Sequence, residues 1–182
     1  SAVELNVSCP NVKEGGIAFG TDLTVFTNLL KKVRPVTDCP LIVKLSPNVT
    51  DIRPFAKRAQ EIGVDALSAV NTFLGMKIDV KTGRPHFNNK VAGLSGPAIR
   101  PLAVRVVYQI KEVVTIPIIG IGGIATLEDV LEFMMAGASA IQVGTMNMVD
   151  PSISGKLLAE LENYMKEEKI DDLKDIIGLA HR

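Results

Sequence analysis

Five short apolar runs alternate with amphipathic helical stretches along this chain, and this alternation limits its fold more than any other feature. The runs cover residues 2–7, 41–45, 66–70, 117–121 and 140–143. They are almost continuously apolar, which is typical of strands in a parallel sheet that is covered on both faces. Because strands that alternate with helices are joined by right-handed crossovers, the sequence predicts five β/α units in one α/β domain.

Residue types at the helix ends support this division. Asp22 or Thr21 can cap the first helix, because either side chain can accept a backbone N–H of the first turn. Gly63 suits the end of the second helix, and Thr126 suits the start of the helix after the fourth strand. The connection 71–95 has little helical periodicity, and a connection this long inside a domain is usually functional or disordered.

The composition narrows the range of partners. The chain has 182 residues, 47% of them apolar, which suits one domain or part of a larger one. Lys+Arg and Asp+Glu both number 20, and aromatic residues make up only 4%. This balance gives no electrostatic argument for nucleic acid or an anionic membrane, and no apolar run reaches the length of a membrane span.

The cysteines and the first residues bear on location. Cys9 and Cys39 are too few for a disulfide framework and favour a reducing compartment, so we expect a cytoplasmic protein. The first residues lack the basic region and the apolar stretch of a signal peptide. The chain opens almost directly into a strand, as if it were cut from something longer.

The segment Asn6-Val7-Ser8-Cys9-Pro10-Asn11 places a thiol among amide and hydroxyl side chains at the end of the first strand. Loops at strand ends carry function while the strands hold them in place, and Pro10 fixes the backbone just after the thiol. On these residues alone, two interpretations stay open: a reactive thiol, or a buried cysteine in an ordinary turn.

Two glycine turns follow the last two strands. Gly120-Ile121-Gly122-Gly123-Ile124 lies between a strand and a helix, and Val143-Gly144-Thr145 lies at the next strand end. Glycines let backbone N–H groups approach an anion closely, and (β/α) barrels form a phosphate site after their last two strands. The pair therefore favours phosphate binding over the alternative, which is tight packing of helix on strand.

Other candidates also lie at strand ends. Lys44 sits in an apolar strand, where an unpaired ammonium is costly, so we expect an anionic partner rather than simple exposure to solvent. Asn71 and Thr72 can fix a planar polar ligand, although taken alone they fit a turn with a capping Thr better. Gly96 can offer its N–H to a ligand or serve as an ordinary cap. Open and closed α/β sheets place their sites at these carboxyl ends.

No metal site is predicted. His86 and His181 are isolated in the sequence and lack carboxylates or thiolates at ligand spacing.

Taken together, these residues resemble the dihydroorotate dehydrogenase family. The segment from Asn6 to Asp22 looks like the catalytic loop of the NAD-linked subclass (class 1B), and Cys9 argues against the membrane-bound subclass, which carries serine there. The other positions that fall in the family's order and spacing are Lys44, Val70-Asn71-Thr72, Gly96, Gly122-Gly123 and Gly144-Thr145.

The resemblance implies an FMN enzyme that oxidises dihydroorotate to orotate in pyrimidine synthesis. Cys9 would then be the base that takes a proton from C5 of dihydroorotate, while hydride from C6 passes to the flavin N5. Lys44 would lie beside the flavin N1 and C2 carbonyl. The implied substrate residues are Asn6, Asn71 and Thr72. The implied FMN residues are Asn6, Lys44, Val70, Gly96, Gly122, Gly123, Gly144 and Thr145.

The resemblance also implies partners and a larger fold. In the NAD-linked subclass the catalytic subunit, expected here as a homodimer, works with a subunit that carries FAD and an iron–sulfur cluster and passes electrons to NAD. The family fold is an eight-unit TIM barrel, (β/α)8. We therefore expect residues 1–182 to form a single partial TIM-barrel domain that lacks the first three β/α units, and that alone neither binds FMN tightly nor turns over.

Two other functions remain open from the sequence. One is another FMN barrel that acts on pyrimidines, like dihydropyrimidine dehydrogenase. The other is an inactive half-barrel that serves as a scaffold.

Overall fold

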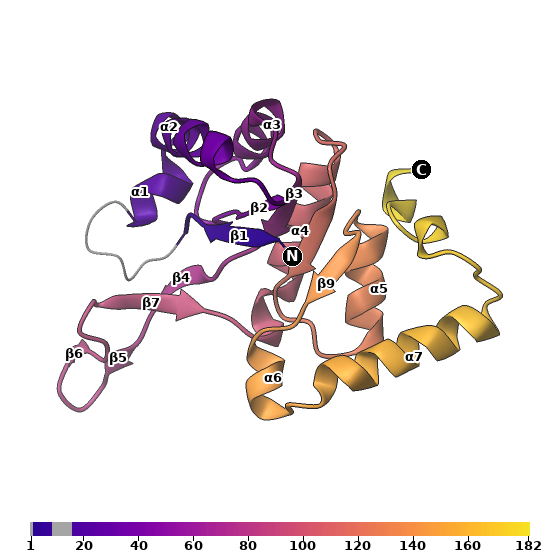
Figure 1. The fold of residues 1–182 in the computed structure, drawn as a ribbon. Coiled ribbons are helices and arrows are strands. Elements are labelled where there is room, and N and C mark those ends of the chain that lie inside the picture. Colours follow the sequence, from indigo (N-terminus) through magenta and orange to yellow (C-terminus); the bar gives the residue numbers. More distant parts are fainter. Residues whose placement is uncertain (1, 9–15) are drawn as a thin grey trace.

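Five parallel strands form the central sheet (Figure 1), and their order in space is β1-β2-β3-β8-β9. The computed structural model describes residues 2–8 and 16–182. The strands are β1 (Val3–Asn6), β2 (Leu41–Lys44), β3 (Ala66–Ala69), β8 (Ile118–Ile121) and β9 (Ala140–Gln142). Every neighbouring pair is parallel. The five predicted strands are therefore confirmed, each to within one residue at either end.

Five longer helices pack on the sheet or continue from it. They are α2 (Leu23–Val33), α3 (Arg53–Ile62), α4 (Arg100–Lys111), α5 (Leu127–Met135) and α7 (Ile153–Glu167). Alternate residues of β2 show which face the helices cover: Leu41 and Val43 are fully buried, whereas Ile42 and Lys44 are only half-buried. The main core therefore lies between the helices and one face of the sheet, and the other face carries the second set of side chains.

The predicted helix ends are confirmed where they can be compared. Asp22, not Thr21, caps α2, because its carboxylate accepts the N–H groups of Thr24 and Val25 at 2.8 and 2.9 Å. Gly63 ends α3 in the left-handed conformation, with φ 88°. Thr126 forms a capping box at the start of α5.

The sheet is strongly curved. Gln142 of β9 donates a hydrogen bond to the Glu4 carboxylate of β1 at 2.9 Å, although β1 and β9 are the two edges of the sheet. In a flat sheet these strands would be four spacings, or roughly 19 Å, apart. Figure 1 shows the two edge strands facing each other, so the sheet curls as a barrel wall does.

The connection 71–95 is not a plain loop. Strand β4 (Phe73–Met76) pairs antiparallel with β7 (Val91–Leu94), and β5 (Ile78–Asp79) pairs with β6 (Arg84–Pro85). We call these strands and their turns the arm, which projects from the body of the molecule (Figure 1). The sequence prediction missed it because strands of two to four residues, interrupted by glycine, leave too short a pattern to read.

Several short helical pieces complete the described chain. They are α1 (Gly16–Thr21), η1 (Arg34–Val36), η2 (Pro97–Ile99), α6 (Thr145–Val149), η3 (Leu173–Asp175) and η4 (Leu179–His181). Within residues 2–8 and 16–182, none of the helices has the length and apolar character needed to cross a membrane.

Candidate functional site

One cavity, of about 210 Å³, lies at the carboxyl ends of β2, β3, β8 and β9. We call it the strand-end cavity. Its lining residues are Lys44, Val70, Asn71, Thr72, Ser95, Gly96, Ile99, Ile121, Gly122, Gly123, Gly144 and Thr145. Because parallel strands end at the same edge of a sheet, segments that are far apart in the sequence meet here.

All but two of the predicted site residues line this cavity. One exception is Cys9, which lies outside the described residues. The other is Asn6, which ends β1 directly beside Lys44 in the sheet register. The Asn6 side-chain oxygen accepts hydrogen bonds from the backbone N–H and the hydroxyl of Ser8, at 3.1 and 3.0 Å. Asn6 therefore shapes the turn that leads to Cys9.

Ser8 ties this turn to the neighbouring strand ends. Asn71 donates its side-chain N–H to the Ser8 carbonyl at 3.0 Å, and the Ser8 hydroxyl reaches the Lys44 carbonyl at 3.4 Å. The residue that precedes Cys9 is thus anchored beside two residues of the strand-end cavity.

Three lining residues were not predicted: Ser95, Ile99 and Ile121. Ser95 accepts a hydrogen bond from the Thr145 hydroxyl at 2.9 Å, which joins the base of the arm to the turn after β9. A serine just before Gly96-Pro97 was visible in the sequence, but nothing there indicated that Thr145 lies opposite it. Ile121 could have been found, because it lies between the glycines of a predicted turn.

Lys44 is half-buried and lines the cavity. Within residues 2–8 and 16–182, no carboxylate lies at ion-pair distance from its ammonium. The predicted anionic partner is therefore not a side chain of the described protein. A cation at a cavity wall without a carboxylate partner is suited to an anionic ligand.

Gly122 and Gly123 are required by packing. Their φ angles are 143° and 80°, in the range that favours glycine. A Cβ on Gly122 would lie 2.6 Å from the Ala103 Cβ, and one on Gly123 would lie 2.8 Å from the Gly96 carbonyl. Close packing thus explains both glycines, and it brings this turn against Gly96.

The N–H groups of Gly122 and Gly123 have no acceptor in the part of the chain that the structure describes.

Gly144 differs from that pair in both respects, whereas Gly96 has a φ of 90° that favours glycine but no close packing around the missing Cβ. A Cβ on Gly144 would meet nothing within 4 Å, and one on Gly96 would meet only the Thr145 methyl group, at 3.6 Å. Packing against the protein therefore does not explain why Gly144 lacks a side chain. Both glycines line the cavity, where a missing Cβ leaves room for a ligand to approach the backbone.

A buried carboxylate fixes the two turns relative to each other. Asp129, only 1% exposed, accepts the N–H groups of Ala125 and Thr126 at 2.8 and 3.0 Å. It also pairs with Arg100 at the start of α4. Arg100 in turn contacts Glu132 at 3.3 Å. The starts of α4 and α5, and with them Gly96 and Gly123, are thereby locked together.

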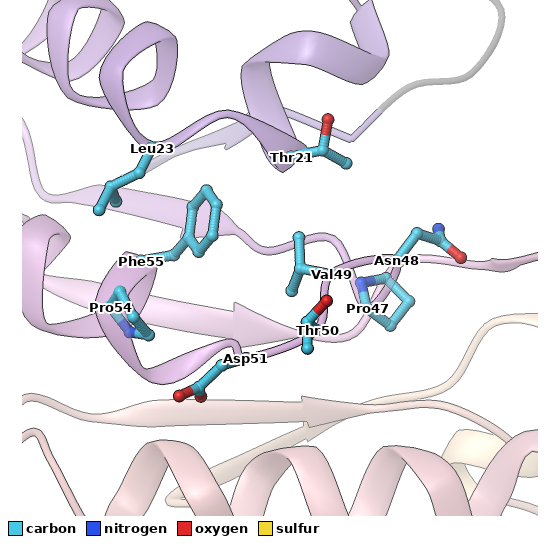
Figure 2. A pocket seen from close by; sticks show the side chains of 9 residues that line it. All are labelled: Thr21, Leu23, Pro47, Asn48, Val49, Thr50, Asp51, Pro54 and Phe55. Atoms are coloured by element: carbon cyan, nitrogen blue, oxygen red, sulfur yellow. The ribbon is translucent and has the colours of Figure 1, made fainter.

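A second hollow, larger and more open, lies between the α1–α2 corner and the loop after β2 (Figure 2). Its one carboxylate, Asp51, is already bonded to the Arg53 guanidinium at 2.9 and 3.0 Å. The hydrogen bond from Arg53 holds the pKa of Asp51 below its usual value. This hollow offers no unpaired charged group, and within residues 2–8 and 16–182 no cluster of His, Cys, Asp and Glu could hold a metal ion.

The fold and the strand-end cavity define a parallel β/α protein whose site lies at the strand ends, beside glycine turns after its last two strands. A family model for dihydroorotate dehydrogenase matches residues 1–165, and the chain belongs to that family. The family fold is a TIM barrel, and the five parallel units fit part of such a barrel.

Three relatives show the extent of the likeness. A "Dihydroorotate dehydrogenase B (NAD(+)), catalytic subunit" of Carboxydothermus hydrogenoformans is 55% identical over 181 residues, which are 100% of this chain and 59% of the relative. A protein of the same name from Listeria monocytogenes is 54% identical over 175 residues, 96% of this chain and 58% of the relative. An Aquifex aeolicus protein with dihydroorotate dehydrogenase A (fumarate) in its name is 52% identical over 183 residues, 100% of this chain and 60% of that protein. The chain thus spans about three fifths of the length of the curated relatives it matches.

Proposed function

We propose that this chain is the catalytic part of a flavin-dependent dihydroorotate dehydrogenase, which oxidises dihydroorotate to orotate for pyrimidine synthesis. One observation carries the proposal: all but two of the residues that the resemblance assigns to substrate and FMN line a single cavity, although they come from four separate strand ends and the base of the arm. The names of the relatives, at 54–55% identity for two of them, support the same reaction.

The residues present fit FMN. Open space beside Gly96 and Gly144, and the N–H groups of Gly122 and Gly123, suit a phosphate, and Lys44 suits the electron-rich edge of the ring. The cavity of about 210 Å³ is smaller than the roughly 300–1,000 Å³ of typical small-molecule sites. The cavity would therefore hold only part of the cofactor. When bound, FMN supplies the acceptor for the hydride.

The substrate would lie on the side of the cavity nearest β1. Asn71 and Thr72 line that cavity, and Asn6 lies beside Lys44. The hydrogen bond from Asn71 to the Ser8 carbonyl brings the residue before Cys9 in the sequence next to Asn71. In the proposed reaction Cys9 would be the general base that accepts the C5 proton, and the Lys44 ammonium would stabilise the negative charge that the hydride brings to the flavin ring.

We further propose the NAD-linked form, in which a homodimer of catalytic subunits works with a subunit that carries FAD and an iron–sulfur cluster. The words "catalytic subunit" in the relatives' names support a partner subunit. We propose a cytoplasmic location, and a single partial-barrel domain over residues 1–182.

Turnover assays on the intact protein, purified with whatever subunits accompany it, test the proposal. We expect dihydroorotate oxidation with NAD as acceptor, and no turnover with dihydrouracil. Cys9→Ala should lower the rate at neutral pH by about 10²–10⁴-fold, the usual contribution of a general base. Oxidation with fumarate but not NAD would move the protein to the other subclass. Turnover that is unchanged in Cys9→Ala would remove Cys9 from the mechanism.

A further inference from the structure

We propose that Asn48 is a positioning residue for substrate binding, which acts by fixing Thr72. Asn48 lies in the loop between β2 and α3 and does not line the strand-end cavity. The inference rests on the proposed function, because it takes Thr72 as a substrate residue.

One side-chain amide holds the backbone on both sides of Phe73. Asn48 donates its side-chain N–H to the Thr72 carbonyl at 3.0 Å, and its side-chain oxygen accepts the Leu74 N–H at 2.9 Å. These two bonds imitate the pairing of a neighbouring strand, because an amide offers one donor and one acceptor in a fixed geometry. We call this pair of bonds the Asn48 bracket.

Asn48 is itself held in place. Its backbone N–H donates to the Ser46 hydroxyl at 3.3 Å, and Ser46 is buried. Pro47 restricts the backbone between them. Figure 2 shows Asn48 at one end of this loop, with its amide directed away from Phe55. The bracket is therefore anchored to the body of the molecule through the buried Ser46.

The Thr72 side chain packs against Gly93 of β7. A Cβ on Gly93 would lie 2.8 Å from the Thr72 Cβ and nearer still to the Thr72 hydroxyl oxygen, so the Thr72 side chain, hydroxyl included, lies against the backbone of Gly93. The Asn48 bracket uses only the backbone carbonyl of Thr72, and within residues 2–8 and 16–182 the Thr72 hydroxyl has no hydrogen-bond partner. The side chain is thus oriented by its neighbours, which lowers the entropy that a substrate must remove on binding.

The bracket also fixes the base of the arm. Phe73 pairs with Leu94 in the strand register, and Leu94 immediately precedes Ser95 and Gly96 of the cavity wall. Loss of the Asn48 bracket should therefore change the position of the substrate residue Thr72 directly. It should affect the position of the FMN residues only indirectly, through the arm.

Orotate affinity in the holoenzyme tests this role. The intact protein is loaded with FMN and titrated with orotate while the visible flavin spectrum is followed, and its FMN content is measured separately. The variants are Asn48→Ala, Asn48→Asp and Thr72→Val, with exposed Asn88→Ala of the arm as the matched control. Asn48→Asp keeps the acceptor for Leu74 but loses the donor to Thr72, so it remains informative if Asn48→Ala folds poorly.

We expect Asn48→Ala and Asn48→Asp to weaken orotate binding by about 5–30-fold, as expected for the loss of one or two hydrogen bonds that orient a binding residue. The FMN content of the Asn48 variants should equal that of the wild type, and so should the orotate affinity of Asn88→Ala. In the Asn48 variants KM for dihydroorotate should change more than kcat. In a Thr72→Val background, Asn48→Ala should weaken orotate binding by less than about a further twofold, because the effects of coupled residues are not additive.

Three results would overturn the inference: wild-type orotate affinity in both Asn48 variants, full additivity with Thr72→Val, or a parallel loss of FMN. A wild-type holoenzyme that binds no orotate at all would instead overturn the proposed function itself, and this inference with it.

Discussion

Lys44 combines three properties: it ends an apolar strand, lines a cavity and lacks a carboxylate partner among residues 2–8 and 16–182. The apolar strand alone was enough to predict that the Lys44 ammonium has an anionic partner. The sequence could not predict whether this partner is a protein carboxylate or a ligand, because this depends on which strands become neighbours.

Replacing Lys44 by Ala should lower the reduction potential of the bound flavin. A positive charge beside the ring stabilises the anionic reduced form, so its loss should shift the potential to more negative values by roughly 20–60 mV, equivalent to 1–3 kcal/mol for two electrons. Equilibration with redox dyes measures this shift, and exposed Lys57→Ala is the matched control. A reduction potential equal to that of the wild type would show that Lys44 does not lie beside the flavin ring.

Asp150 gives a pH-dependent prediction at the corner between α6 and α7. Its carboxylate accepts from the Lys156 ammonium at 2.6 Å and from Ser152, and these bonds lower the pKa of Asp150 from 3.8 to about 2. Because the folded pKa lies below the unfolded value, this stabilisation is present above pH 4 and is lost as the pH falls towards 2. Urea denaturation should therefore find Asp150→Asn less stable than wild type at pH 7, with most of the difference gone at pH 2. A difference that is as large at pH 2 as at pH 7 would contradict this account.

Strand–turn–helix units are the elements that the sequence predicted best. Their signals are local: apolar runs for β2 and β8, and capping chemistry at Asp22 and Thr126. The arm was missed because its pairing is between residues such as Phe73 and Leu94, which lie far apart along the chain and carry no strong turn signature. For the same reason, the contact between Ser95 and Thr145 was out of reach.

The sequence left two explanations for the glycines near the last two strands, phosphate binding and tight packing of helix on strand. The structure gives different answers for Gly120 and Gly144. A Cβ on Gly120 would lie 2.6 Å from the Phe133 ring and 3.1 Å from the Ala138 Cβ, whereas one on Gly144 would meet nothing within 4 Å. We expect Gly120→Ala to lower the free energy of unfolding by about 1–3 kcal/mol through overpacking. Gly144→Ala should change it by less than about 0.5 kcal/mol but weaken FMN binding by roughly tenfold.

Denaturation and FMN titration of these two variants check the distinction, and each variant serves as the control for the other. Unchanged FMN affinity in Gly144→Ala would show that the turn after β9 does not approach the cofactor.

At the scale of the whole molecule, the curvature of the sheet accounts for the site. The hydrogen bond between Glu4 and Gln142 shows that β1 and β9 curl towards each other, so groups on the first and last strands can serve one ligand. The parallel order was predictable from the alternation of strands and helices. The degree of curl was not, because it results from the twist of all five strands together.

The central claim is that residues after β1 and the glycine turns after β8 and β9 act on one flavin and its substrate. Anaerobic mixing of the intact, FMN-loaded protein with dihydroorotate tests this claim most directly, because it isolates the transfer of hydride from substrate to flavin. We expect the visible flavin absorbance to bleach in a single turnover and orotate to form in equal amount, with bleaching slowed about 10²–10⁴-fold in Cys9→Ala. Flavin that stays oxidised in the wild-type protein would contradict the account.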